Sequence, residues 1–481
     1  MRARRVYGVL LAAVVAVWLG HLRGSLGIDE AVTHWVVGAG PAETFRRGMD
    51  YQFSPVAFFL PWASAALLGT TELALRLPSL LAMLATALFV AAIAARTWDR
   101  EAGALAAIVF ASERLIAFQA ANARPYALGL ATLTGSLLLL LRWLDTGCRR
   151  EAVGAALLSS LTAHVHPLLG LALVVHVVVL LRAVLGRRLA WSKAAGLLGL
   201  TGLFLVPLAA ELRSLATRQA ALTYAAVPAF SDLFELIVPA ETMGAVALAL
   251  VVGVLLGGRP TTAGVRSDSD APALALCWLA LPALLLFAIS RLTPSSVLTP
   301  HYAIAGTPAL ALVLGGALRL LATVPARLAG AATVVAVTLA AHATDPDRQR
   351  TWRQDWRAAA VVVRAEAGPD TPVLVISGLV EANQPEWLTD PEKASYLLCP
   401  FAMYPVPGRL VPLPWRSDTP ALSEHVAKVV EGVRSSARFL FVARGDAGVV
   451  EEFLLRQLAP QGFRARRAAG TEGLLVSVFE R

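Results

Sequence analysis

Long apolar runs, interrupted by short polar connections, occupy the first 344 residues of the chain. Eleven of these runs are predicted to be membrane-crossing helices, because each is apolar over most of the length that a helix needs to cross a bilayer. The predicted spans cover approximately residues 6–24, 72–95, 102–120, 126–144, 152–164, 168–185, 194–210, 243–257, 272–290, 302–321 and 327–343. The pattern therefore predicts a polytopic α-helical membrane protein with about eleven transmembrane helices.

One further apolar stretch, residues 54–69, is shorter than the roughly 20 residues that span the hydrocarbon of a bilayer. We expect it to form a helix that lies in the outer membrane interface. Residues 211–242 have a pattern typical of a second pair of surface helices. Because residues 54–69 do not cross, the connection 96–100 falls on the cytoplasmic side, where its two arginines belong.

Basic residues gather in the connections that every second span brings to the same side of the membrane. They are Arg2, Arg4, Arg5, Arg96, Arg100, Arg149, Arg150, Arg187, Arg188, Lys193, Arg259 and Arg266, the last two in the Gly/Ser/Asp-rich loop 258–271. Lysine and arginine are enriched in cytoplasmic loops, so the N-terminus is predicted to be cytoplasmic. No small-x-small cleavage site follows the first apolar run, which is therefore interpreted as an uncleaved anchor.

The chain changes character after the last span. Residues 373–377 and 438–443 are short β-type runs bounded by turn residues, and residues 421–433 between them have a helical pattern. We predict a transmembrane domain over residues 1–344, with an outer-face loop at 26–71, and a soluble α/β domain over residues 345–481. Eleven crossings place this C-terminal domain outside the cytoplasm.

The composition supports a membrane protein and excludes some other classes. Hydrophobic residues make up 57% of the chain, charged residues 16%, and the mean hydropathy is +0.64. That is more apolar surface than a soluble fold can bury. The net charge of +9 does not indicate nucleic-acid binding, because the arginines orient the chain in the bilayer. Three widely separated cysteines form no metal-type spacing and no disulfide framework.

Two adjacent carboxylates, Asp29 and Glu30, follow directly after the first span, in the segment 27–35 on the outer side. One interpretation is structural: both residues cap an amphipathic interfacial helix and complement its dipole. The other is catalytic: one carboxylate accepts a proton from a substrate. The residues themselves leave both interpretations open.

Further polar side chains collect at the outer ends of the predicted spans. They are Arg76, Glu113, Arg114, Asn122, Arg124, Tyr126, His164, His166, Arg213, Arg218, Arg291, His301 and Tyr302. Ionisable groups near a membrane are costly unless they face a cavity or a partner, so several are predicted to line one cleft. The alternatives are arginines that reach lipid headgroups, histidines that cap helix ends, and a local ion pair between Glu113 and Arg114.

A carboxylate beside cationic groups at a membrane surface suits one chemistry in particular. A group is transferred from a lipid-linked phosphate to a hydroxyl or amine, the carboxylate acts as general base, and arginines bind the phosphate that leaves. No Gly-rich phosphate loop of a nucleotide site occurs in the sequence.

The order of motifs along nearly the whole chain resembles the multispanning class C (GT-C) glycosyltransferases. The resemblance is greatest to the family-39-like bacterial enzymes related to protein O-mannosyltransferases and aminoarabinose transferases. The matching motifs are Ile28-Asp29-Glu30-Ala31, Ser54-Pro55, the run from Gly69 to Ser79, Ala123-Arg124-Pro125-Tyr126-Ala127-Leu128, His166-Pro167, His301-Tyr302 and the run from Asp355 to Ala360.

The resemblance implies an inverting enzyme of the bacterial inner membrane that uses a polyprenyl-phosphate-linked sugar and an envelope acceptor (glycan, lipid or protein). It implies Asp29 as the base, with Glu30 beside it in the catalytic site. Substrate or phosphate contacts are expected from Arg124, Tyr126, Asn122, His166, His301, Tyr302 and Ser54. No cofactor is expected, although a divalent metal is compatible with this chemistry.

Three positions depart from the pattern of the family. Phe53-Ser54-Pro55 stands where the family often has His-Pro-Pro or Lys-Pro-Pro, and His301-Tyr302 stands where it has Arg-Tyr. Asn122 stands where the family has an acidic residue. These positions would contact the donor phosphate or a second acidic site, so the resemblance does not specify the donor or any dependence on a metal.

Two rival functions remain open at this point. A transporter or flippase of lipid-linked intermediates would be expected to show broken helices and ionisable groups at the bilayer midplane. The polar groups of this chain concentrate instead at one face. A catalytically silent relative that only binds polyprenyl lipid is the second rival.

Overall fold

The computed structural model describes residues 2–52, 54–222, 226–261, 271–344, 354–416, 419–445 and 448–481. Phe53, Arg266 and the side chain of Arg218, all named above, lie outside this described part. The chain divides into two compact units. The membrane unit comprises Met1–Leu22, Pro41–Gly69 and Leu73–Thr344, and the C-terminal unit comprises Arg23–Gly40, Thr70–Glu72 and Asp345–Arg481. The sequence placed the boundary at residues 344 and 345, whereas the structure also assigns the segment with Asp29 to the C-terminal unit.

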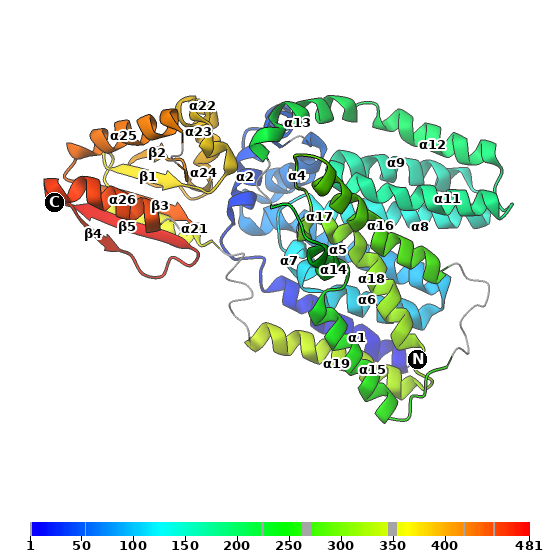
Figure 1. Cartoon of the computed structure of the whole chain (residues 1–481). Coiled ribbons are helices and arrows are strands. Elements are labelled where there is room, and N and C mark those ends of the chain that lie inside the picture. Colours follow the sequence, from blue (N-terminus) through cyan, green and yellow to red (C-terminus); the bar gives the residue numbers. More distant parts are fainter. Residues whose placement is uncertain are drawn as a thin grey trace. The chain divides into compact units, whose positions relative to one another are not determined.

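Helices joined by short connections make up most of the described part of the membrane unit (Figure 1). Its helices are α1 (Arg2–Leu19), α3 (Pro41–Gln52), η1 (Pro55–Phe58), α4 (Phe59–Leu68), α5 (Glu72–Thr97), α6 (Arg100–Ser112), α7 (Arg114–Ala120), α8 (Tyr126–Thr146), α9 (Arg149–Val165), α10 (Pro167–Gly170), η2 (Leu171–Leu173), α11 (Val174–Leu185), α12 (Trp191–Leu205), α13 (Leu208–Leu222), α14 (Phe230–Ile237), α15 (Ala240–Leu255), α16 (Ala271–Leu292), α17 (Pro300–Ala303), η3 (Ile304–Gly306), α18 (Thr307–Arg319) and α19 (Val324–Thr344). Every predicted span therefore overlaps one or more of these helices.

Six of the described helical segments are long and apolar enough to cross a membrane, or up to eight if two bent pairs each count as one span. The remaining three predicted spans lie on α1, on α6 with α7, and on α9. Helix α1 carries Arg2, Arg4 and Arg5, whereas α6 and α9 contain only 13 and 17 residues. The chain is thus a multi-pass membrane protein, and the number of eleven crossings stays a prediction.

The two bent pairs each break at a proline. Helices α12 and α13 meet at 56° around Pro207, and α14 and α15 meet at 47° around Pro239. Proline has no N–H to donate and its ring clashes with the preceding turn, which ends the first helix of each pair. The predicted surface helices at 211–242 are therefore parts of these two bent pairs. The apolar stretch at 55–68 forms a short helical segment, as predicted.

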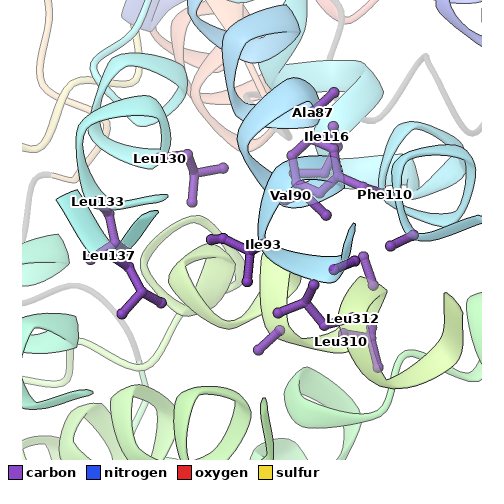
Figure 2. Packing of buried hydrophobic residues seen from close by; sticks show 14 of the residues in the cluster. Ala87, Val90, Ile93, Phe110, Ile116, Leu130, Leu133, Leu137, Leu310 and Leu312 are labelled. Atoms are coloured by element: carbon purple, nitrogen blue, oxygen red, sulfur yellow. The ribbon is translucent and has the colours of Figure 1, made fainter. Parts of the chain in front are cut away.

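Small residues allow the helices of the membrane unit to pack closely. Helix α6 packs against α1, α18 and α19. A Cβ atom added at Gly315 of α18 would lie 2.6 Å from the Cα atom of Ala106 on α6, so glycine is required at that crossing. Figure 2 shows Val90, Ile93 and Phe110 in the apolar core of the membrane unit. This packing holds the helix ends that carry the polar residues described below.

The C-terminal unit contains a five-stranded mixed sheet with helices on both faces (Figure 1). Its strands are β1 (Pro372–Ile376), β2 (Arg409–Pro412), β3 (Arg438–Arg444), β4 (Arg464–Arg467) and β5 (Leu474–Glu480), in the order β2-β1-β3-β5-β4. Strand β1 is parallel to β2 and β3, and β5 is antiparallel to β3 and β4. The predicted α/β domain is confirmed, with the two expected strands as β1 and β3.

Helices cover this sheet on both sides. The helical segments of the unit are α2 (Ile28–Val37), α21 (Trp356–Glu366), η4 (Val380–Asn383), α22 (Pro385–Thr389), α23 (Pro391–Leu397), α24 (Cys399–Met403), α25 (Pro420–Arg434), α26 (Gly448–Leu458) and η5 (Ala459–Gln461). Apolar residues of α25 and α26 pack with Phe439 and Phe441 of β3 in one core cluster. Helix α21 packs against β3 and β5. Successive residues of a strand face opposite sides of the sheet. Because helices cover both sides, β3 is buried from Phe439 to Ala443.

Candidate active site

The acidic pair lies in the first turn of α2, and its two members have different environments. Gly27 is the N-cap residue, and Glu30 is buried with Oε2 accepting the Gly27 N–H at 3.1 Å. Asp29, one residue earlier, is exposed. The structure therefore gives the predicted capping role to Glu30. It leaves the Asp29 carboxylate accessible at the positive end of the helix dipole.

Four ring-bearing side chains converge in the membrane unit. Tyr126 begins α8, His166 lies in the connection between α9 and α10, and His301 and Tyr302 lie on α17. The ring centroid of Tyr126 lies 5.4 Å from that of His166 and 5.6 Å from that of His301, on which it stacks. His166 and Tyr302 are 5.1 Å apart. Residues from three distant motifs of the sequence are thus brought to one place, and we call these four residues the ring cluster.

A buried amide supports the ring cluster from one side. Gln119 of α7 is fully buried, and its Oε1 atom accepts a hydrogen bond from the Asn122 Nδ2 atom at 3.0 Å. Its Nε2 atom lies 3.1 Å from the His301 Nδ1 atom. Because the amide nitrogen donates, Nδ1 of His301 is the acceptor and Nε2 carries the proton of the neutral ring. Gln119 was not predicted from the sequence, although a glutamine is unusual in so apolar a run.

Arg124 lies in the tight connection between α7 and α8, beside the ring cluster. The Arg124 N–H donates to the Asn122 carbonyl at 2.8 Å, and the Nη1 atom donates to the Gln52 Oε1 atom at 3.2 Å. Burial, and after it the charge of Arg124, lowers the pKa of His166 to about 3. His166 is therefore neutral at physiological pH, and Arg124 supplies the positive charge of this pair. Gln52 is a second residue that the sequence did not indicate.

Ser54 is buried and bonded to the backbone next to the ring cluster. It is 4% exposed, and its hydroxyl donates to the backbone carbonyls of His164, at 2.5 Å, and Val165, at 2.8 Å. These bonds tie the start of η1 to the end of α9, directly before His166. The described contacts of Ser54 therefore support the segment before His166, and its predicted contact with substrate stays a prediction.

Several other polar residues at helix ends have structural partners. Arg76 is buried and donates to two backbone carbonyls at the end of α1, at 3.0 and 3.1 Å. Glu113 caps α7 by accepting a backbone N–H at 2.9 Å, a role that differs from the local ion pair considered above. His164 pairs with Glu211 at 2.8 Å, and Arg291 donates to a backbone carbonyl at 3.4 Å. Arg76, Glu113 and His164 therefore stabilise the bundle.

Within the described residues, no group of three or more histidine, cysteine, aspartate or glutamate side chains is arranged to hold a metal ion. No disulfide joins the three cysteines, and Cys148 is the exposed one. The expectation of a reaction without a cofactor stays a prediction.

The sequence and the fold of the chain were compared with those of known proteins. Residues 52–210 match the family model described as dolichyl-phosphate-mannose-protein mannosyltransferase. No curated protein matches the sequence of the chain. The apo structure of ArnT from Cupriavidus metallidurans superposes with a TM-score of 0.58 at 15% identity, covering 99% of this chain and 98% of that one.

Two further solved structures have a fold similar to that of this chain. The same ArnT bound to undecaprenyl phosphate gives a TM-score of 0.56 at 15% identity, over 98% of this chain and 97% of that one. The arabinofuranosyltransferase AftD from Mycobacteria gives 0.50 at 16% identity, over 99% of this chain but only 41% of that one. Nearly the whole chain is thus similar in fold to solved membrane glycosyltransferases.

Proposed function

We propose, on the premise that the chain has the fold of the class C membrane glycosyltransferases, that it transfers a sugar from a polyprenyl-phosphate carrier to an acceptor of the cell envelope. The resemblance of the sequence motifs to the class C glycosyltransferases is confirmed by the structural matches to ArnT and AftD and by the family match over residues 52–210. Inversion at the sugar carbon, the acceptor and the role of each residue are parts of the proposal.

The observation that carries the proposal is the convergence of the ring cluster with Arg124 at the ends of apolar helices. The guanidinium of Arg124 is suited to binding a phosphate, and the rings of the ring cluster are suited to packing against the sugar attached to that phosphate. Arginine forms two parallel hydrogen bonds to phosphate oxygens, and aromatic faces pack against sugar C–H groups. Each of these residues was expected in the site from the sequence, and the fold brings them together.

The proposed reaction is a single displacement. Asp29 accepts the proton of an acceptor hydroxyl or amine, whose oxygen or nitrogen then attacks the anomeric carbon of the donor sugar. A bond forms between the acceptor and the sugar while the bond from the sugar to the phosphate oxygen breaks. The phosphate keeps the electron pair and departs as polyprenyl phosphate, with Arg124 binding the charge that develops.

The carrier and the compartment follow from the same premise. The matched ArnT structure contains undecaprenyl phosphate, which supports a polyprenyl phosphate as the carrier here. We assign the protein to the bacterial cytoplasmic membrane, with the C-terminal unit on the outer face. The acceptor would then be a glycan, lipid or protein of the envelope.

The two bent helix pairs are compatible with the transporter alternative, because broken helices are typical of transporters. Both bends, however, are accounted for by Pro207 and Pro239. The two functions differ in chemistry, since a flippase moves its lipid intact whereas a transferase releases polyprenyl phosphate.

The test uses purified protein with a radiolabelled polyprenyl-phosphate sugar and an envelope extract as acceptor. We expect release of polyprenyl phosphate with transfer of label to the extract. Mass spectrometry of envelope glycans from a deletion strain, complemented with the wild type or with Asp29→Asn, then identifies the product. An unchanged glycan profile in the deletion strain, together with intact donor in vitro, would reject the transferase function.

The topology makes a separate prediction. Reporter fusions after Arg100, Arg150, Lys193 and Arg266 are expected to report the cytoplasm, and fusions after Asp50, Ala123, Ser231 and Asp355 the outer side. The reason is the alternation of basic connections with the predicted spans. A cytoplasmic signal after Asp355 would contradict eleven crossings and the outer location of the C-terminal unit.

A further inference from the structure

Side chains from the far end of the chain hold the first residue of α2 and the residue before its N-cap. The Leu26 N–H donates to the Tyr404 hydroxyl at 2.9 Å, and the Ile28 N–H donates to the Gln354 Oε1 atom at 2.9 Å. Both bonds are buried, and all four residues belong to the C-terminal unit. The N–H groups of a helix start have no partner within the helix, so these two side chains satisfy donors that would otherwise need water.

Gln354 can hold Ile28 in only one orientation. Its Oε1 atom also accepts the indole N–H of Trp356 at 3.2 Å, and Trp356 is fully buried at the start of α21. Since both neighbours are donors, the oxygen end of the amide must face them. Gln354 is itself only 9% exposed. The amide is thus a fixed acceptor rather than a mobile surface group.

Tyr404 is fixed in a similar way from its other side. Its hydroxyl donates to the Glu72 Oε1 atom at 3.0 Å while it accepts from Leu26. Glu72 also pairs with Arg357, whose Nη2 atom donates to the Arg23 carbonyl at 3.1 Å. Residues 23–28, the segment that leads into α2, are therefore bonded at several successive positions to one set of side chains.

The rest of α2 is anchored to the same unit. The Trp35 indole N–H donates to the Ser395 hydroxyl at 3.1 Å, and the Trp35 ring meets the edge of Tyr396 at 5.4 Å. Helix α24 packs against α2. Asp29 thus projects from a helix whose backbone is bonded near its first turn and packed along its length.

We propose that Gln354 and Tyr404 are positioning residues that set the place of Asp29 for proton transfer, an inference that rests on the proposed function of Asp29. A general base must be within hydrogen-bond reach of the proton it accepts, and a displacement of about 1 Å can cost on the order of 100-fold in rate. The C-terminal unit is then part of the catalytic machinery, because it holds the helix that carries the base.

The test compares variants that remove a bond with one that keeps it. Gln354→Leu and Tyr404→Phe remove the acceptors of the Ile28 and Leu26 N–H groups while nearly preserving side-chain volume. We expect each to lower kcat by about 10-fold to 100-fold with little change in KM for the donor lipid, as misplacement of the base alone predicts. Gln354→Glu keeps an acceptor oxygen for both donors and is expected to restore much of the lost kcat.

Thr419→Ala is the matched control for stability. The Thr419 hydroxyl caps α25 in the same unit by accepting the Leu422 N–H, and neither residue bonds to α2 in the described structure. Loss of this cap is expected to lower the Tm of the protein with kcat unchanged. A fall in kcat for Thr419→Ala as large as that for Gln354→Leu would mean that loss of stability alone explains both results, and it would overturn the proposal.

A double-mutant cycle separates positioning from a general structural role. If Gln354 acts through Asp29, Gln354→Leu should cause no further loss of the residual rate in Asp29→Asn. A further loss would contradict the proposal, as would normal kcat in both Gln354→Leu and Tyr404→Phe. Hydrogen exchange of the amides in residues 26–30 should accelerate in both variants, and unchanged exchange would overturn the proposal even where turnover falls. Wild-type protein that releases no polyprenyl phosphate would instead reject the proposed function, and the inference with it.

Discussion

Asp29→Asn is expected to lower the release of polyprenyl phosphate by at least about 100-fold, the effect typical of removing a general base. The amide has nearly the shape of the carboxylate but cannot take up the proton of the acceptor. The cap of α2 is formed by Gly27 and Glu30, so the substitution leaves these bonds in place. The measurement is turnover of a lipid-linked sugar by purified protein, with the Tm determined beside it.

Asp29→Ala provides the comparison that separates a base from a capping residue. The catalytic role predicts that Asn and Ala are equally inactive, with Tm values close to that of the wild type. A capping role predicts a different order, because Asn caps a helix about as well as Asp whereas Ala costs about 1 kcal/mol. Normal turnover in Asp29→Asn with a loss only in Asp29→Ala would assign Asp29 to the stability of α2.

Arg124→Lys is expected to lower kcat/KM about 10-fold or more, although the positive charge is kept. The guanidinium offers several N–H donors in one plane, and one of them already donates to Gln52. A lysine ammonium cannot hold Gln52 and a phosphate in the same planar geometry, so at least one charge-assisted hydrogen bond, worth about 1.5–3 kcal/mol, is weakened. The measurement is the rate of donor turnover as a function of donor concentration.

Arg291→Lys is the matched control for this substitution. Arg291 is an exposed arginine at the end of α16, and its contact with the Pro228 carbonyl, at 3.4 Å, is long. A cation there is expected to interact with lipid headgroups, which accept lysine as readily as arginine. Equal turnover by Arg124→Lys and the wild type would place Arg124 in the same class of headgroup or structural residues.

The helices of the membrane unit could be predicted from the sequence because their signal is local. An apolar run of sufficient length has only the helix available in a bilayer, since every backbone N–H and C=O must be paired within the segment. All eleven predicted spans accordingly overlap one or more helices. The breaks at Glu113, Pro207 and Pro239 were harder to place, because each divides a run whose hydropathy continues across it.

The sheet was predicted only in part. Strands β1 and β3 are buried along their length and read as apolar runs, whereas β4 has the sequence Arg464-Ala465-Arg466-Arg467. An edge strand of this kind is defined by pairing with β5 rather than by any pattern of its own. Strand formation at such positions depends on a neighbour that only the folded chain supplies.

The members of the ring cluster were predicted because polar residues at the ends of apolar runs are few. Their supports were not, since the bond from Arg124 to Gln52 joins positions 72 apart and the bond from Gln119 to His301 joins positions 182 apart. No local pattern encodes such pairs. The sequence determined which motifs carry polar groups, and the packing of the helices decided which of them share a site.

The acidic pair Asp29 and Glu30 shows most directly which properties follow from the sequence and which follow from the tertiary structure. By itself the sequence determined that two carboxylates follow the first span and that both could either cap a helix or take up a proton. Only the tertiary structure decided which of the two caps α2, because the cap depends on where α2 begins, and that start is held by Gln354 and Tyr404, which lie 326 and 378 positions away from their partners. Glu30 became the buried cap and Asp29 the exposed carboxylate for this physical reason.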